Sequence, residues 1–184
     1  MKDEEQLLIQ KAKSGESGAF GQLYDKYLPA IYRFVFIKIG RKQDAEDISQ
    51  QVFIKAWQNI GGYEFQGTPF SSWVYRIASN AVIDYYRTYK GDVNIDTVPE
   101  DHFSEMSDVA ERIDSAINMK HLRVALMKLE PDQQNVLIMK FVDDLSNKEI
   151  AEALEKTEGA VRVIQHRALK QLKNHVDEQH KITT

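Results

Sequence analysis

The sequence contains no cysteine and only 4 prolines among its 184 residues. Without cysteine the chain has no disulfide, no thiolate metal site and no thiol nucleophile, which fits a reducing cytoplasm. It also lacks any run approaching the roughly 18 apolar residues that a membrane-spanning helix needs. The acidic N-terminus, MKDEEQLLIQKAK, holds too short an apolar run for a signal peptide. We therefore expect a cytoplasmic protein.

An excess of positive charge is missing as well, because 24 Lys and Arg residues face 28 Asp and Glu residues and the formal net charge is −4. Proteins that bind nucleic acid usually carry a basic surface, so this balance at first argues against DNA binding. The acidity is concentrated in the middle of the chain, where residues 91–130 hold 4 Lys or Arg and 9 Asp or Glu. The flanking parts are nearly neutral and attract phosphates only weakly. If the chain binds DNA, we expect it to need a partner.

Strict apolar–polar alternation, the pattern of β-strands, is missing, and helical periodicity runs through most of the chain. The sequence therefore predicts an all-α protein. Pro29 is predicted to start or kink a helix, and Pro131 to occupy the first position of another. Further helix boundaries are predicted at the N-caps Ser17, Asp44, Thr68, Ser146 and Thr157 and at the terminating residues Gly40 and Gly61-Gly62.

Residues 91–111 differ from the rest of the chain. They contain seven acidic residues, no Lys or Arg, and Pro99. This composition indicates an extended acidic linker. We expect it to join two small helical domains, residues 1–90 and residues 112–184. The aromatic helix of residues 69–87 belongs to the first domain, and a basic helix pair belongs to the second.

The helix pair lies in residues 145–173. Ser146 followed by Glu149 forms a capping box, and a turn of three residues, 155–157, separates the two helices. In the second helix an apolar stripe is predicted to be buried, whereas the opposite face is polar and basic. The stripe consists of Val161, Ile164, Ala168 and Leu172, and the opposite face presents Arg162, Val163, His166, Arg167 and Lys170.

This arrangement fits a helix-turn-helix, whose second helix enters the major groove. Arg162 and Arg167 suit bidentate contacts to guanine, Val163 suits a thymine methyl group, and Lys170 suits phosphate. The alternative is an ordinary helical hairpin with a solvated basic face. The combination of cap, turn and basic face favours the DNA-binding interpretation.

In residues 69–87, Phe70, Val74, Ile77 and Ala81 share one helical face and are predicted to be buried. A polar stripe occupies the other face, and aromatic residues nearby offer flat surfaces on which unstacked bases could stack. Trp73 suits the hydrophobic core equally well. The stripe consists of Arg76, Asn80, Asp84 and Arg87, and the aromatic residues are Tyr63, Phe65, Trp73 and Tyr75.

Five stretches together resemble the sigma subunits of bacterial RNA polymerase, specifically the extracytoplasmic-function (ECF) group. They occur in the order and spacing of that family and cover most of the chain apart from the linker and the tails. The stretches are FGQLYDKYLPAIYRF, DAEDISQQVFIKAW, FSSWVYRIASNAVIDYYR, LEPDQQNVLIMKF and the helix-turn-helix.

The resemblance implies a sigma factor with a region 2 domain and a region 4 domain. Region 2 would recognise the melted minus-10 element with the aromatic residues and polar stripe given above. Region 4 would recognise duplex minus-35 DNA through the start and exposed face of its second helix, and would touch the polymerase flap. Its candidate residues are Thr157, Glu158, Arg162, Val163, His166, Arg167 and Lys170.

The resemblance also assigns a role to the helix of residues 44–60, whose polar face by spacing alone is only a solvated surface. This helix would dock on the clamp helices of the largest polymerase subunit. The acidic linker would run through the polymerase, and an anti-sigma factor would be a further partner. Gln51 stands where the family often has an acid, and Glu155 replaces a glycine common in the turn. The candidate docking residues are Asp47, Gln50, Gln51, Phe53 and Lys55.

Two other classes of function stay open from the sequence alone. One is a conventional helix-turn-helix regulator that binds a palindrome as a dimer without polymerase. The other is a helical adaptor that only interacts with other proteins. An enzyme is disfavoured, because the histidines and acidic residues show no triad or metal-ligand spacing. We therefore expect no catalytic residue, no metal and no cofactor.

Overall fold

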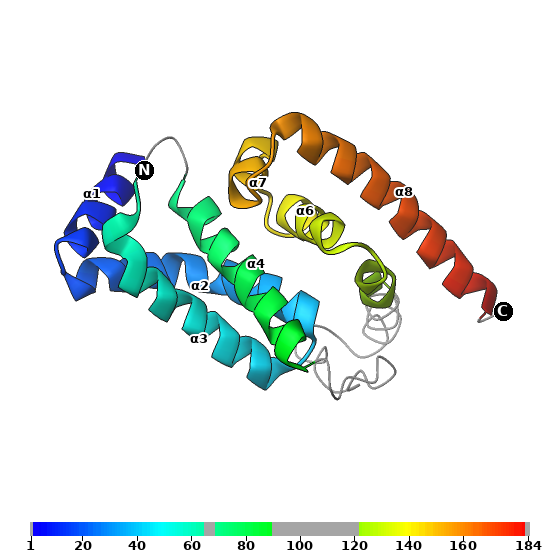
Figure 1. Cartoon of the computed structure of the whole chain (residues 1–184), viewed down its shortest axis with the longest axis horizontal. Coiled ribbons are helices and arrows are strands. Elements are labelled where there is room, and N and C mark those ends of the chain that lie inside the picture. Colours follow the sequence, from blue (N-terminus) through cyan, green and yellow to red (C-terminus); the bar gives the residue numbers. More distant parts are fainter. Residues whose placement is uncertain (1, 65–68, 90–121, 183–184) are drawn as a thin grey trace, which may run out of the picture. The chain divides into compact units, whose positions relative to one another are not determined.

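The computed structural model describes residues 2–64, 69–89 and 122–182, and all regular secondary structure in these ranges is helical. The predicted all-α fold class is therefore confirmed. The chain divides into two compact units, Met1–Asp92 and Val93–Thr184 (Figure 1). The predicted linker, Phe65 and the proposed N-cap Thr68 lie outside the described residues. No helix in the described ranges is long and apolar enough to cross a membrane.

The first unit is built around its second helix, which packs against the three other long helices (Figure 1). The third and fourth helices also pack against each other. The fourth helix therefore has two neighbours, which bury a wide arc of its surface. The elements are α1 (Lys2–Lys13), α2 (Ser17–Ile39), α3 (Lys42–Asn59), the 3-10 helix η1 (Ile60–Gly62) and α4 (Phe70–Tyr89).

Helix α2 ends where the sequence predicts, but it does not begin there. Gly40 adopts a left-handed φ of 75° and donates its N–H to the carbonyl of Phe36 at 2.7 Å, which ends the helix. Pro29 lies inside one continuous helix, so of the two predicted alternatives, a helix start or a kink at this residue, the start is wrong. Ser17 is the first helical residue, and Glu16 occupies the N-cap position.

The predicted N-cap of α3 is also wrong. The helix begins at Lys42, with Arg41 before it, and Asp44 lies within the first turn. A carboxylate in the first turn is stabilised by the positive end of the helix dipole, so the acid suits this position without capping. The carboxylate accepts a hydrogen bond from the hydroxyl of Tyr85 at 2.6 Å.

Large apolar side chains fill the centre of the first unit. Each contributes roughly 1.5–3 kcal/mol through removal of its surface from water. As predicted, Phe70, Val74 and Ala81 of α4 are buried, whereas Ile77 is half-buried. The largest fully buried side chains of this unit are Leu23, Ile31, Phe34, Val35, Val52, Phe70, Val74, Tyr75 and Val82.

The second unit consists of a helical stretch over residues 122–127 followed by three labelled helices. The amide of Gln134 donates to the carbonyl of Met127 at 3.4 Å and to that of Leu129 at 2.8 Å, which ties the 122–127 stretch and the turn after it to the next helix. Pro131 occupies the first position of that helix, as predicted. The labelled helices are α6 (Pro131–Phe141), α7 (Asn147–Ala153) and α8 (Glu158–Ile182).

Candidate nucleic-acid interface

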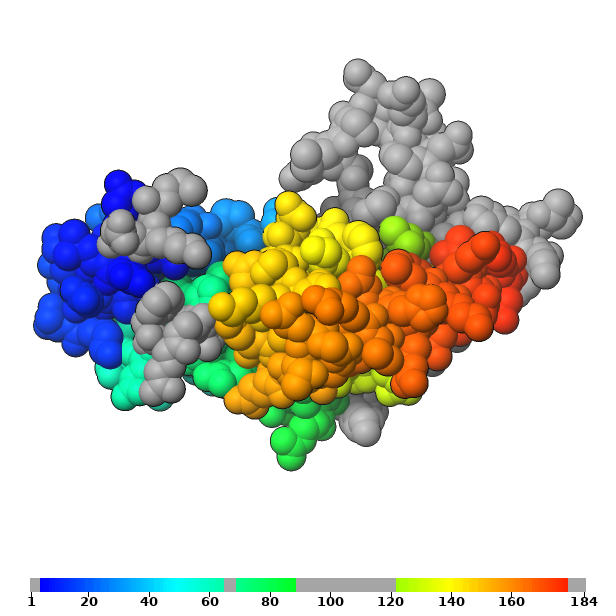
Figure 2. Space-filling model, turned by 90° about the horizontal axis from the view of Figure 1, so that it is seen from above, coloured from blue at the N-terminus to red at the C-terminus, as the bar shows by residue number. Residues whose placement is uncertain are grey.

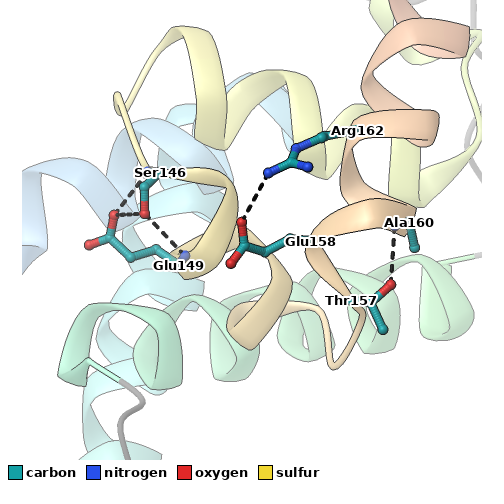
Figure 3. Close-up of polar contacts among 6 residues, drawn as sticks. All are labelled: Ser146, Glu149, Thr157, Glu158, Ala160 and Arg162. Atoms are coloured by element: carbon teal, nitrogen blue, oxygen red, sulfur yellow. Dashed lines mark hydrogen bonds and ion pairs between the residues drawn. The ribbon is translucent and has the colours of Figure 1, made fainter.

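The start of α7 is fixed by the capping box that the sequence predicts. The backbone N–H of Ser146 donates to Oε2 of Glu149 at 2.8 Å, and the N–H of Glu149 donates to Oγ of Ser146 at 3.2 Å. The Ser146 hydroxyl itself donates to Oε2 of Glu149 at 2.7 Å (Figure 3). Two backbone donors that a helix start leaves without partners are thereby satisfied.

The turn between α7 and α8 keeps a tight geometry although glycine is absent. Glu155 has a φ of 55°, in the left-handed region that normally favours glycine. The N–H of Lys156 then returns to the carbonyl of Ala151 at 2.8 Å. Oγ1 of Thr157 accepts the N–H of Ala160 at 3.1 Å, which confirms the predicted cap of α8 (Figure 3). The turn therefore fixes how α8 leaves α7.

The buried side of α8 packs on α6 and α7, and its opposite side is open to solvent. Val161 and Ala168 are fully buried, whereas Ile164 and Leu172 are half-buried. The outer side of α8 forms a continuous face of the second unit (Figure 2). All seven residues predicted for duplex DNA are exposed: Thr157, Glu158, Arg162, Val163, His166, Arg167 and Lys170.

The charge on this face is mostly positive, with one acid at its N-terminal end. Arg162, Arg167 and Lys170 are the cations among the seven residues, and Glu158 is the acid. Nη2 of Arg162 lies 3.4 Å from Oε2 of Glu158, and both side chains are well exposed (Figure 3). Val163 adds an apolar side chain that is 49% exposed. The face thus offers guanidinium donors and an apolar contact at the spacing of a recognition helix.

A second polar face runs along α4. Asn80, Asp84 and Arg87 are exposed, and Arg76 is half-buried. Nη1 of Arg87 lies 3.6 Å from Oδ1 of Asp84, one turn away. Ile83, which the sequence analysis did not select, is 45% exposed beside them. In the sequence, Ile83 is marked only by its position, because it is an apolar residue on the polar face of α4.

For three of the four predicted aromatic residues, the structure contradicts the prediction that they offer flat surfaces to bases. Tyr63 is 4% exposed, Trp73 is 9% exposed and Tyr75 is 1% exposed. The ring of Tyr63 packs on Trp73 at a centroid distance of 5.0 Å, and that of Tyr75 packs edge-on against Phe34 at 5.4 Å. These rings are part of the hydrophobic core. Trp73 and Tyr75 lie on α4, which is covered on two sides, and Tyr63, which follows η1, packs on Phe70 and Trp73.

The predicted docking face of α3 is exposed at four of its five positions. Asp47, Gln50, Gln51 and Lys55 are exposed. Phe53 is 2% exposed and packs edge-on against Tyr24 at 4.9 Å, so its place on that surface is wrong. The neighbouring residue Ile54 is 56% exposed.

No arrangement in the described ranges suits metal chemistry. No group of three or more His, Asp or Glu residues there is placed to hold a metal ion. Within the helix-turn-helix, burial raises the pKa of Glu152, with a smaller opposing effect from Lys148. Glu152 lies on α7, and the negative charges of Glu149 and of Glu158, at the start of α8, add to the increase.

Comparison with known families matches both units. The model of sigma-70 region 2 matches residues 23–91, and that of sigma-70 region 4 matches residues 120–172. The chain is 33% identical over 170 residues to the ECF RNA polymerase sigma factor BldN of Streptomyces coelicolor. This alignment covers 90% of this chain and 63% of BldN. It is 31% identical over 179 residues to the ECF sigma factor SigW of Bacillus subtilis, covering 90% of this chain and 92% of SigW.

Solved structures share the fold. CnrH, solved in complex with the cytosolic domain of CnrY, aligns with a TM-score of 0.72 at 23% identity, over 95% of this chain and 98% of CnrH. The sigma factor RpoE from Bartonella quintana, solved in complex with the anti-sigma factor NepR, aligns with a TM-score of 0.67 at 22% identity, over 86% of this chain and 96% of RpoE. At these identities the likeness concerns the fold.

Proposed function

Because this chain belongs to the extracytoplasmic-function sigma factors of RNA polymerase, we propose that it directs core RNA polymerase to promoters and helps to open them. The observation that carries the proposal is the presence of both sigma regions, in family order, on one chain with an exposed polar face in each unit. A conventional helix-turn-helix regulator would need only the second unit.

The exposed face of α8 is proposed to recognise the duplex minus-35 element. Its capped start presents Thr157, Glu158 and Arg162 toward the groove, as expected of a recognition helix that contacts bases near its N-terminal end. Arg162 and Arg167 supply donors for guanine, whereas Lys170 suits phosphate. Loss of one such base contact should cost about 1–3 kcal/mol of binding free energy.

The polar face of α4 is proposed to hold the melted minus-10 element. Asn80, Asp84 and Arg87 are exposed there, so they can hydrogen-bond base edges and phosphates directly. The buried rings of Tyr63, Trp73 and Tyr75 support this face from behind rather than stacking on bases. Arg76 belongs to the same stripe, and Phe65 remains a candidate base contact outside the described residues.

The exposed face of α3 is proposed to dock on the clamp helices of the polymerase. Asp47, Gln50, Gln51 and Lys55 provide its polar part. Ile54, which is 56% exposed among these polar residues, replaces Phe53 as the apolar contact. An isolated apolar side chain inside a polar patch suits a protein interface.

Residues 1–90 and 112–184 are proposed to act as the two sigma domains, with residues 91–111 as the linker that passes through the polymerase. An anti-sigma factor is a proposed partner, supported by the complex of RpoE with the anti-sigma factor NepR. The chain would act in the cytoplasm, where the polymerase and the chromosome are. Sigma factors are not enzymes, and we assign no catalytic residue and no cofactor to this chain.

Reconstituted transcription tests this proposal. Purified chain is added to core RNA polymerase with a library of linear promoter fragments, and the transcribed sequences are recovered. We expect binding to core polymerase and initiation from sequences that share two conserved elements. Absence of both would overturn the proposal. Tight, sequence-specific binding of the free chain to duplex DNA without polymerase would favour the conventional regulator.

A further inference from the structure

The last turn of α4 is joined to two other helices by the hydroxyl groups of adjacent tyrosines. The hydroxyl of Tyr86 donates to the backbone carbonyl of Lys38 near the end of α2, at 2.6 Å. The hydroxyl of Tyr85 donates to Oδ2 of Asp44 in the first turn of α3, also at 2.6 Å. The two rings meet edge to face at 5.5 Å. Both tyrosines are half-buried, between the core and the exposed end of α4.

The two hydrogen bonds differ in what they connect. The carbonyl of Lys38 is one of the last four of α2, which lack partners inside the helix, so Tyr86 completes a helix end. The carboxylate of Asp44 has no such deficit. It is already stabilised by the start of α3 and by Nη1 of Arg41 at 3.3 Å. The contact from Tyr85 therefore adds a directional link between α4 and α3.

Asp44 lies at the head of the proposed docking face. On a helix, residues three and four positions apart share a face, so Asp44, Asp47, Gln51 and Lys55 form one stripe along α3. The neighbours of Tyr85 on α4 include the exposed residues Asp84 and Arg87 of the proposed minus-10 face. One hydrogen bond thus connects the start of the docking stripe with the turn of α4 that carries the end of the DNA-facing stripe, although Tyr85 itself lies on a different side of that turn.

We propose that Tyr85 is a positioning residue that sets the end of α4 relative to the polymerase-docking face of α3 through its hydrogen bond to Asp44. The inference rests on the proposed function of both faces. Once α3 is bound to the polymerase, Asp44 is a fixed point. Tyr85 then determines where Asp84 and Arg87 meet the upstream part of the melted strand.

The environment of Tyr85 supports a persistent bond. Burial, followed by the hydrogen bond to Asp44 and its negative charge, raises the pKa of Tyr85 to about 12, against a smaller opposing effect of Arg41, which also hydrogen-bonds the Tyr85 side chain. The phenol therefore stays a donor throughout the pH range of transcription. Bonds from a hydroxyl to a carboxylate are short and about twice as strong as neutral ones.

The test compares Tyr85→Phe, Asp44→Ala and the double variant in reconstituted holoenzyme. Tyr24→Phe is the matched control, because Tyr24 lies in the same unit and its hydroxyl makes no hydrogen bond to any described residue. Three quantities are measured: affinity for core polymerase, thermal unfolding, and the lifetime of competitor-resistant complexes on a promoter whose minus-10 region is already melted.

Tyr85→Phe should leave affinity for core polymerase within about twofold and shorten the lifetime about tenfold, the size expected for loss of a hydrogen bond to a charged group. The double variant should be no worse than Asp44→Ala, whereas Tyr24→Phe should match the wild type. The inference is overturned if Tyr85→Phe retains the wild-type lifetime. It is also overturned if the double variant shortens the lifetime by the combined effects of Tyr85→Phe and Asp44→Ala. It is also overturned if core binding and unfolding temperature fall in parallel with the lifetime. A wild-type chain that fails to bind core polymerase would instead overturn the proposed function.

Discussion

The guanidinium of Arg162 lies 3.4 Å from the carboxylate of Glu158, one turn closer to the start of α8. Both side chains are largely exposed, at 67% and 45%, so water screens the pair and it adds little to stability. Its importance lies in the DNA-facing surface. In the proposed minus-35 complex, Glu158 would pair with Arg162, one of the two proposed guanine contacts, and would place one negative charge near the DNA phosphates.

The first prediction therefore concerns Glu158→Ala. Removing this acid should raise the affinity of the holoenzyme for nonspecific duplex DNA about two- to tenfold and reduce its discrimination among minus-35 sequences. The free energy of unfolding should change by less than about 1 kcal/mol. Fluorescence anisotropy at several salt concentrations measures the affinity for nonspecific duplex DNA and the affinity for minus-35 sequences. Glu178→Ala, which removes an exposed acid near the other end of α8, is the control and should leave discrimination intact.

A second prediction separates two neighbours on α3. Phe53→Ala should lower the free energy of unfolding by about 3–5 kcal/mol, because Phe53 is 2% exposed and its loss opens a cavity beside Tyr24. Ile54→Ala should leave stability nearly unchanged and weaken binding to core polymerase, because Ile54 is 56% exposed. Chemical denaturation and a competition assay for core polymerase measure these quantities. Unchanged binding by Ile54→Ala would remove Ile54 from the docking face.

The docking face also shows which residues could be placed from the sequence and which could not. Helical spacing located the polar residues of α3 correctly, because any residue on the outer side of a helix is visible from its period. Phe53 and Trp73 could not be placed in this way. Each lies at the margin of an apolar stripe, and its burial depends on a neighbouring helix such as the one that carries Tyr24. How wide the buried face of a helix is depends on the helices packed against it, so the periodicity of that helix alone cannot predict it.

Local features were more predictable. The caps Ser146 and Thr157 were correct because a cap depends on a side chain and a backbone N–H three residues later. Asp44 was assigned as a cap for the same reason, yet it lies in the first turn of α3. Its partner Tyr85 is distant in sequence, so no local pattern could reveal the contact.

The third prediction concerns the turn before α8. Glu155→Gly should raise the free energy of unfolding of the second unit by about 0.5–1 kcal/mol, because a residue with a side chain is strained at a φ of 55° and glycine is not. Asp144→Gly, at a φ of 54°, should gain less, since aspartate tolerates this conformation better. Thermal unfolding measures both variants. A loss of stability in Glu155→Gly would show that its side chain is needed in the turn.

The fourth prediction concerns the ionisation of Tyr85. Its pKa is raised from 10.0 to about 12, so the folded state holds this proton more tightly than the unfolded state. The resulting stabilisation is complete below pH 10 and is lost as the pH rises through 12. Ultraviolet titration of tyrosinate should show a late transition that Tyr85→Phe lacks. Asp44→Ala should move it to lower pH, because the hydrogen bond to Asp44 and its negative charge are lost while burial and the opposing effect of Arg41 persist.

The central claim is that two faces of one chain recognise a promoter in different states, duplex DNA at α8 and melted DNA at α4. The most direct test is to measure initiation by holoenzymes carrying Arg162→Ala or Asn80→Ala on a fully duplex promoter and on one with a melted minus-10 region. Arg162→Ala should weaken selection of the minus-35 element, by the 1–3 kcal/mol of a base contact, and initiate nearly normally on the melted template. Asn80→Ala should keep minus-35 selection, but its complex with the melted template should be less stable and should initiate less. If both variants lose the same function, the proposed division between α8 and α4 is wrong.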